Sequence, residues 1–268
     1  MMEYWVRYGL EFNPFLKNAK EIFVDTAETK ETLCRLDLLA QTKGFGLLTG
    51  GPGKGKTTTV RTWAEALNPA LFKVVYSGLS TLSVNDFYRN LAAGLGTEPA
   101  FRKPDNFRHI QEEINRLALE KRKTPVIIID EADHMDSAVL NDLKILFNFE
   151  MDSRDRAVIL MVGLPRLNTK LRLSMHEPIR QRLVMNYNIE GLKKEDGRRF
   201  IEYKLKGAGS TFPVFDEAAL EAILNAADGT PRMIAKLCTA GMIAADSREL
   251  KTVTADAAMQ AINDCELG

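Results

Sequence analysis

The sequence contains few cysteines, and they form no recognisable pattern. Cys34, Cys238 and Cys265 are widely spaced, odd in number, and include no C-x-x-C pair. This argues against a disulfide framework and against a zinc site. We therefore expect three buried free thiols.

Long hydrophobic runs are also missing. The longest uncharged apolar stretches, Val126–Ile129 and Ala157–Leu164, fall far short of the roughly 18 residues that span a bilayer. Residues 1–15 mix charged and aromatic side chains and lack the pattern of a secretory signal. We predict a protein without a membrane helix that stays in the cytoplasm.

Neither sign of charge dominates. The 36 Lys and Arg residues balance 36 Asp and Glu residues, so the formal net charge is zero. No overall field would draw this chain to nucleic acid, and any such contact has to come from local patches. With 45% hydrophobic and 27% charged residues, the composition is that of a soluble globular protein rather than a disordered chain.

Short apolar runs with helical stretches between them predict the fold. Runs of this kind, apolar on both faces and separated by helices, are typical of a parallel sheet covered by helices. The sequence therefore predicts an α/β core. The expected strands are Phe45–Thr49, Phe72–Ser77, Val126–Asp130, Ala157–Val162 and Met185–Ile189.

After Gly191 only amphipathic helices are expected. Asp216 and Thr254 can cap two of them, and Pro231 fits the first turn of another. We predict an α/β domain over residues 1–192, with an N-terminal segment and helix at 1–43, and an all-helical lid domain over 193–268. The expected helices are Lys193–Lys206, Asp216–Ala227, Pro231–Ala245 and Thr254–Asp264.

A glycine-rich loop follows the first expected strand and precedes a helical run, Thr57–Leu67. It fits G-x-x-x-x-G-K-[ST], the pattern of a phosphate-binding loop. Glycines let several backbone N–H groups surround a pyrophosphate, and the helix N-terminus adds positive potential. We expect Lys56 to contact the β- and γ-phosphates of a bound nucleotide and Thr57 to ligate Mg²⁺. The predicted nucleotide-binding residues are Gly50, Gly51, Pro52, Gly53, Lys54, Gly55, Lys56, Thr57 and Thr58.

Two adjacent carboxylates end the apolar run 126–129. At the carboxyl edge of a parallel sheet they would lie beside the phosphate loop. We expect Asp130 to complete the Mg²⁺ site and Glu131 to orient the attacking water.

Three arginines are candidates to complete the site. Arg232, in Gly229-Thr230-Pro231-Arg232, stands at the first turn of a lid helix, from which domain closure would bring it to the γ-phosphate. Arg180 and Arg182 lie between the fourth and fifth expected strands, where they could reach a neighbouring subunit's nucleotide. Such a trans arginine finger neutralises charge in phosphoryl transfer and requires an oligomer. We favour Arg182 over Arg180, and the choice stays open.

Together these motifs resemble the AAA+ ATPases, a family of P-loop NTPases. More narrowly, the chain resembles the ExeA-like ATPases, a group close to the TnsC-like and MuB-like ATPases of transposons. The motifs behind the narrower resemblance are Tyr8-Gly9-Leu10, Asn13-Pro14-Phe15, Leu91–Gly96, Ile129–Asp133, Val162–Leu167 and Arg180–Leu183.

The resemblance implies ATP and Mg²⁺ as cofactors and a homo-oligomer, either a ring or a helical filament. Relatives of the transposon branch assemble with ATP on double-stranded DNA, mark a target and recruit or activate a transposase, with an accessory transposition protein as a further partner. ATP hydrolysis then disassembles them. Since no region here resembles the membrane and peptidoglycan-binding parts of the secretion proteins, the resemblance favours the transposon branch, with no membrane partner.

In those relatives, DNA is contacted by the loop that precedes the strand ending in Asp130. Here we assign to that loop Thr97, Arg102, Lys103 and Arg108. Phosphate contacts by Lys and Arg provide affinity without sequence specificity. Charges in a proline-containing loop are also common on a plain solvated surface, and both interpretations stay open. Residues 164–182 carry five basic residues against one acidic residue and could instead serve a subunit interface.

One position departs from the family pattern. The fourth strand of AAA+ proteins usually ends in a polar residue that senses the γ-phosphate, whereas Gly163 and Leu164 stand here. This departure predicts slow or partner-dependent hydrolysis.

Two other functions stay open. One is an ExeA-like ATPase that organises a secretion or envelope complex through protein contacts. The other is a helicase-loader or replication-initiator ATPase. The lack of a DNA-reading domain after the expected lid argues against it.

Overall fold

The expected apolar runs form one sheet of five parallel strands in the order β2-β3-β4-β1-β5. The computed structural model describes residues 3–19, 22–150 and 153–265. Every predicted strand is present, with ends shifted by at most a few residues. The strands are β1 (Gly44–Gly50), β2 (Phe72–Ser77), β3 (Thr124–Ile129), β4 (Val158–Gly163) and β5 (Leu183–Ile189).

Burial along the strands explains which of them have continuously apolar sequences. The central strands β1 and β4 are buried at every residue, and β3 at all but its first. Because both faces of these strands are covered, their sequences are continuously apolar. The edge strands β2 and β5 instead mix buried and exposed residues.

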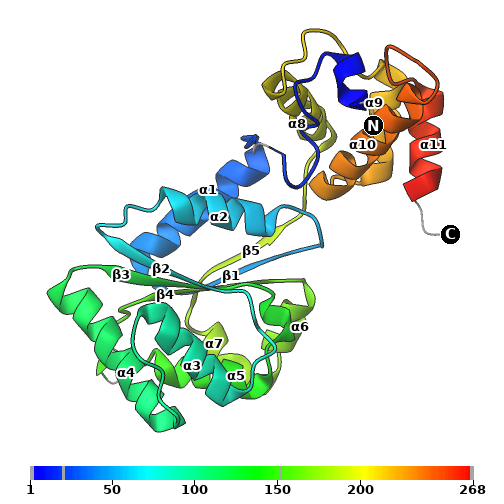
Figure 1. The fold of residues 1–268 in the computed structure, drawn as a ribbon. Helices are drawn as coiled ribbons and strands as arrows, with labels where there is room; N and C mark the ends of the chain where they lie inside the picture. Colours follow the sequence, from blue (N-terminus) through cyan, green and yellow to red (C-terminus); the bar gives the residue numbers. More distant parts are fainter. Residues whose placement is uncertain (1–2, 20–21, 151–152, 266–268) are drawn as a thin grey trace. The chain divides into compact units, whose positions relative to one another are not determined.

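Helices cover both faces of the sheet (Figure 1). On one face, α1 (Ala27–Thr42) and α2 (Lys56–Ala66) place Leu39 and Trp63 in a core shared with Ile128. On the other face, Tyr88 and Leu140 share a second core with Ile127. The sheet is thus the middle layer of an α/β/α unit, and its carboxyl edge carries the loops of the candidate site. The helices of the second face are α3 (Val84–Leu95), α4 (Lys103–Asn115), α5 (Ser137–Leu146), α6 (Arg166–Leu171) and α7 (Glu177–Arg180).

The remaining helices build a second unit. Asp216 caps α9 as predicted, because its side chain accepts a hydrogen bond from the Ala219 N–H at 2.7 Å, and Pro231 is the first residue of α10. The elements of this helical unit are α8 (Lys194–Gly207), α9 (Glu217–Ala227), α10 (Pro231–Asp246) and α11 (Ala255–Cys265).

The N-terminal segment is placed differently from the prediction. The chain divides into an α/β unit of residues Glu31–Pro52 and Lys56–Ile189, and a helical unit that includes Met1–Lys30, Gly53–Gly55 and Glu190–Gly268. Tyr8 is fully buried in the helical unit, and its hydroxyl donates to the Met242 carbonyl at 2.9 Å. The aromatic side chains near the N-terminus therefore anchor this segment to the helical unit rather than to the α/β domain.

Within the described ranges, no helix is both long enough and apolar enough to cross a membrane.

Candidate functional site

The phosphate loop joins β1 to α2, as the sequence predicts. Lys56 is the first residue of α2, and its Nζ donates to the carbonyl oxygens of Gly50 at 2.8 Å and Gly51 at 2.9 Å. Gly55 has a φ of +96°, and no atom of the described residues lies within 4 Å of the place a Cβ would take. The loop therefore has the open backbone, the helix N-terminus and the ammonium group that a triphosphate requires.

A pair of oxygen-bearing side chains meets next to this loop. The Thr57 hydroxyl donates to Oδ2 of Asp130 at 2.9 Å, although the two residues are 73 positions apart. Asp130 follows β3 and is only 7% exposed. A hydroxyl and a carboxylate are hard oxygen ligands of the kind that Mg²⁺ prefers, so this donor set fits the predicted metal.

Glu131 occupies an unusual backbone position. Its φ is +52°, in the left-handed region that glutamate rarely adopts. Its N–H donates to Oδ1 of Asp130 at 2.9 Å, and its carbonyl accepts from the Ser80 hydroxyl at 2.8 Å. The two hydrogen bonds hold this turn in place while the Glu131 side chain stays exposed. Backbone strain of this kind clusters at functional sites.

Tyr76 belongs to the site but was not predicted from the sequence. Its hydroxyl donates to Oδ2 of Asp130 at 3.1 Å, next to the bond from Thr57. Burial, together with the charges of Asp130 and Glu131, raises the pKa of Tyr76 to about 12, so the phenol keeps its proton at neutral pH. No motif marks Tyr76, because the contact joins a side chain of β2 to the side chain of the residue that follows β3.

A buried carboxylate accounts for the glycine at the end of β4. A Cβ on Gly163 would stand 2.7 Å from Oδ1 of Asp133, which leaves no room for a side chain. The Asp133 carboxylate accepts from the Leu164 N–H at 3.0 Å and from Arg166 at 2.6 Å. Burial alone would raise the pKa of Asp133, but these two bonds hold it below its ordinary value. Asp133 and Arg166 thus fill the neighbourhood in which the polar sensor was expected.

Backbone carbonyls accept hydrogen bonds from both candidate finger arginines. Arg182 Nη1 donates to the Lys144 carbonyl in α5 at 2.9 Å, and Arg180 Nη1 donates to the Arg172 carbonyl at 2.8 Å. Both side chains are partly exposed. The choice between them stays a prediction.

Arg232 lies at the second position of α10, with its residue exposed. Its backbone N–H donates to the Gly53 carbonyl at 3.4 Å, and Lys54 Nζ donates to the Asp228 carbonyl at 2.8 Å. These contacts lie within the helical unit, which includes Gly53–Gly55. The role of Arg232 toward a γ-phosphate stays a prediction.

The four predicted DNA contacts do not share one loop. Lys103 begins α4 and Arg108 lies within it, so only Thr97 and Arg102 are in the loop itself. Lys103 pairs with Asp142 at 2.6 Å. Assigning all four residues to a loop was therefore wrong, because the helix begins at Lys103, just ahead of a proline.

Hydrogen bonds further separate these four candidates. Arg108 pairs with Asp105 at 2.7 Å, and the Thr97 hydroxyl donates to the Ala92 carbonyl at 3.0 Å. Arg102 is exposed, and its side chain makes no ion pair within the described residues. Of the four, Arg102 is the one whose charge is fully available to a phosphate.

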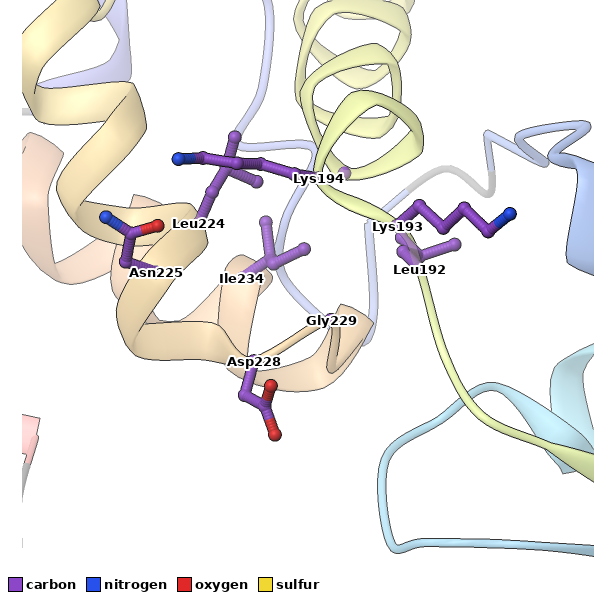
Figure 2. A pocket seen from close by; sticks show the side chains of 9 residues that line it. Leu192, Lys193, Lys194, Leu224, Asn225, Asp228, Gly229 and Ile234 are labelled. Atoms are coloured by element: carbon purple, nitrogen blue, oxygen red, sulfur yellow. The ribbon is translucent and has the colours of Figure 1, made fainter.

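A small pocket of about 220 Å³ lies within the helical unit. Figure 2 shows that Lys193 and Lys194 extend in opposite directions beside it. Lys194 is already paired with Glu221 at 2.7 Å. Of the predicted motifs, the pocket touches only Gly229. It is lined by Leu192, Lys193, Lys194, Gly197, Leu224, Asn225, Asp228, Gly229 and Ile234.

Comparison with known proteins agrees with the motifs. Residues 39–171 match the family described as AAA domain. The chain is 30% identical over 252 residues to general secretion pathway protein A of Aeromonas hydrophila, a match that covers 90% of this chain and 44% of the relative. It is 29% identical over 127 residues to ATP-dependent target DNA activator B of Escherichia phage Mu, covering 46% of this chain and 38% of the relative. The chain thus spans less than half the length of these relatives.

Solved structures agree on the fold. The Cdc6p protein of Pyrobaculum aerophilum has a TM-score of 0.72 at 16% identity, covering 95% of this chain and 71% of that one. The RuvB branch migration motor of Thermotoga maritima has a TM-score of 0.60 at 20% identity, and the match covers 92% of this chain and 71% of that one. At such low identity these similarities establish the P-loop fold alone.

Proposed function

The chain belongs to the AAA+ ATPases, and from this premise we propose that it is a Mg²⁺-dependent ATPase that regulates DNA transposition. In this proposal it assembles with ATP on double-stranded DNA without sequence specificity, marks a target and recruits or activates a transposase. Hydrolysis of ATP disassembles the oligomer.

The observation that carries the ATPase part is the hydrogen bond between Thr57 and Asp130 at 2.9 Å. It brings together the two predicted metal ligands, one from the phosphate loop and one from the end of β3. Mg²⁺, when bound, would neutralise phosphate charge during transfer. The chain's own residues do the rest: Lys56 holds phosphate oxygens, and Glu131 orients water from a turn that two hydrogen bonds fix.

The DNA part is supported by the similarity to the phage Mu protein, whose name describes an ATP-dependent activator of target DNA. Two exposed arginines, Arg102 and Arg172, offer charge for phosphate contacts, since neither side chain forms an ion pair in the described part of the chain. Contacts to phosphates alone would give binding without sequence preference.

A second candidate function is supported by the longer match. Similarity to general secretion pathway protein A extends over 90% of this chain. In this alternative, the ATPase organises a secretion or envelope complex through protein contacts and never binds DNA.

Sedimentation with linear duplex DNA distinguishes the two. We expect the protein to pellet with DNA when a non-hydrolysable ATP analogue and Mg²⁺ are present, and to remain in solution with ADP. Raising the salt from 50 to 200 mM should weaken the binding by about tenfold or more, because phosphate contacts release counterions. If the analogue has no effect on DNA binding, the transposition proposal fails and the secretion candidate is favoured.

A further inference from the structure

The Asp130 carboxylate receives more hydrogen bonds than the predicted site requires. Oδ2 accepts from Thr57 at 2.9 Å and from Tyr76 at 3.1 Å, and Oδ1 accepts from the Glu131 N–H at 2.9 Å. A carboxylate has about four acceptor positions, so these three donors leave one for a further ligand. Only the Tyr76 donor comes from outside the predicted motifs.

Residues 76–80 support the turn that carries Asp130 and Glu131. The Asp130 N–H donates to the Ser77 carbonyl at 3.0 Å, which extends the parallel pairing of β2 with β3 by one bond. The Ser80 hydroxyl donates to the Glu131 carbonyl at 2.8 Å. Together with the Tyr76 hydroxyl, this short segment holds Asp130 and Glu131 at three points.

The Tyr76 side chain is not part of the hydrophobic core. It is 58% exposed, although it lies on a strand of the central sheet. Its neighbour Gly78 leaves room for it, because a Cβ on Gly78 would stand 3.0 Å from a ring carbon and 3.3 Å from the hydroxyl oxygen of Tyr76. The specific contact of this side chain is therefore its hydroxyl on Asp130.

We propose that Tyr76 is a positioning residue for Mg²⁺: its hydroxyl fixes the Asp130 carboxylate so that the Thr57 and Asp130 oxygens face the metal together. This inference rests on the proposed ATPase function. Residues that hydrogen-bond to a metal ligand matter because they lock the orientation of that ligand, and their loss typically weakens metal binding by roughly 10–100-fold. Since Tyr76 is partly exposed, the lower end of this range is expected.

Nucleotide affinity measured with and without Mg²⁺ tests this role apart from turnover. The probe is a mant-labelled non-hydrolysable ATP analogue, whose fluorescence gives a Kd in EDTA and a second Kd in excess MgCl₂. Tyr76→Phe keeps the ring and removes only the hydroxyl. We expect its Kd in EDTA to equal that of wild type, and its Kd in MgCl₂ to be about tenfold weaker.

Two further variants sharpen the test. Gly78→Ala should weaken binding in MgCl₂ in the same direction but less, because the added methyl displaces the Tyr76 ring. Tyr203→Phe is the matched control: Tyr203 is 60% exposed on α8, and both Kd values should stay at wild-type levels.

The possible results separate this inference from the proposed function. If Tyr76→Phe matches wild type in MgCl₂, or weakens binding equally in EDTA, Tyr76 does not position the metal and the ATPase proposal is untouched. If wild type binds the analogue in neither buffer, the ATPase proposal and this inference fall together.

Discussion

Replacing Asp133 by Asn should destabilise the α/β unit by about 2 kcal/mol. The Asp133 side chain is 1% exposed and accepts from the Leu164 N–H and the Arg166 guanidinium. Asn has one acceptor oxygen, so whichever way the amide turns, its NH₂ group faces a donor. An unmade hydrogen bond of a buried group costs about 1–3 kcal/mol. Loss of the ion pair with Arg166 adds little to this destabilisation, because the Arg166 side chain is 55% exposed.

Urea unfolding followed by fluorescence measures this effect. In a Trp5→Phe background, Trp63 is the single remaining tryptophan, and it is buried in the α/β unit. With an m-value of about 2 kcal/mol/M, the midpoint should fall by about 1 M. Asp136→Asn is the matched control, because Asp136 is exposed and makes no side-chain capping bond to α5. A loss below about 0.5 kcal/mol, or an equal loss in the control, would refute the reasoning.

The stability difference between wild type and Asp133→Asn should also depend on pH. The pKa of Asp133 is lowered in the folded protein, so its contribution to stability is complete above the unfolded pKa of about 3.9. That contribution is lost as the pH falls through the lowered folded value. The stability difference between wild type and Asp133→Asn should therefore be constant near neutral pH and shrink below about pH 4. A difference that grows in acid would contradict the assignment.

Other variants test the remaining assignments. Lys56→Ala should abolish ATP binding, as measured by equilibrium dialysis. Undiminished binding would show that the loop holds no phosphate. Arg182→Ala should bind ATP normally but lose hydrolysis in the oligomer, whereas Arg180→Ala should retain it; the reverse result moves the finger to Arg180. Arg102→Ala should weaken DNA binding several-fold and lower its salt dependence. Lys103→Ala should have a smaller effect, because Asp142 already neutralises that lysine, and an equal effect would show that the ion pair opens on DNA.

Local patterns were sufficient to predict most of the fold. The strands β1, β3 and β4 are apolar on both faces because helices cover both, and such runs are visible in the sequence. The helical unit was predicted from turn and cap residues such as Asp216 and Pro231, which act on their own neighbours. The AAA+ family, confirmed by the comparisons, followed from motifs of fixed spacing.

Contacts between distant segments were not predictable in this way. Tyr76 reaches Asp130 only because β2 and β3 are paired, and no spacing rule links the two residues. The Asp133 carboxylate fills the space that a side chain at residue 163 would take. In the sequence alone, Gly163 looks like the loss of the polar sensor. The N-terminal aromatic residues carry no sign of the unit on which they pack, and Tyr8 proved to lie in the helical one.

Single-turnover phosphate release tests the central claim most directly, namely that this chain is an ATPase in which Glu131 orients the attacking water. Wild type and Glu131→Gln are each mixed with substoichiometric ATP, Mg²⁺ and duplex DNA. We predict that wild type releases phosphate, while Glu131→Gln retains intact ATP with a rate lower by about a hundredfold or more. Equal rates in the two proteins would contradict the account.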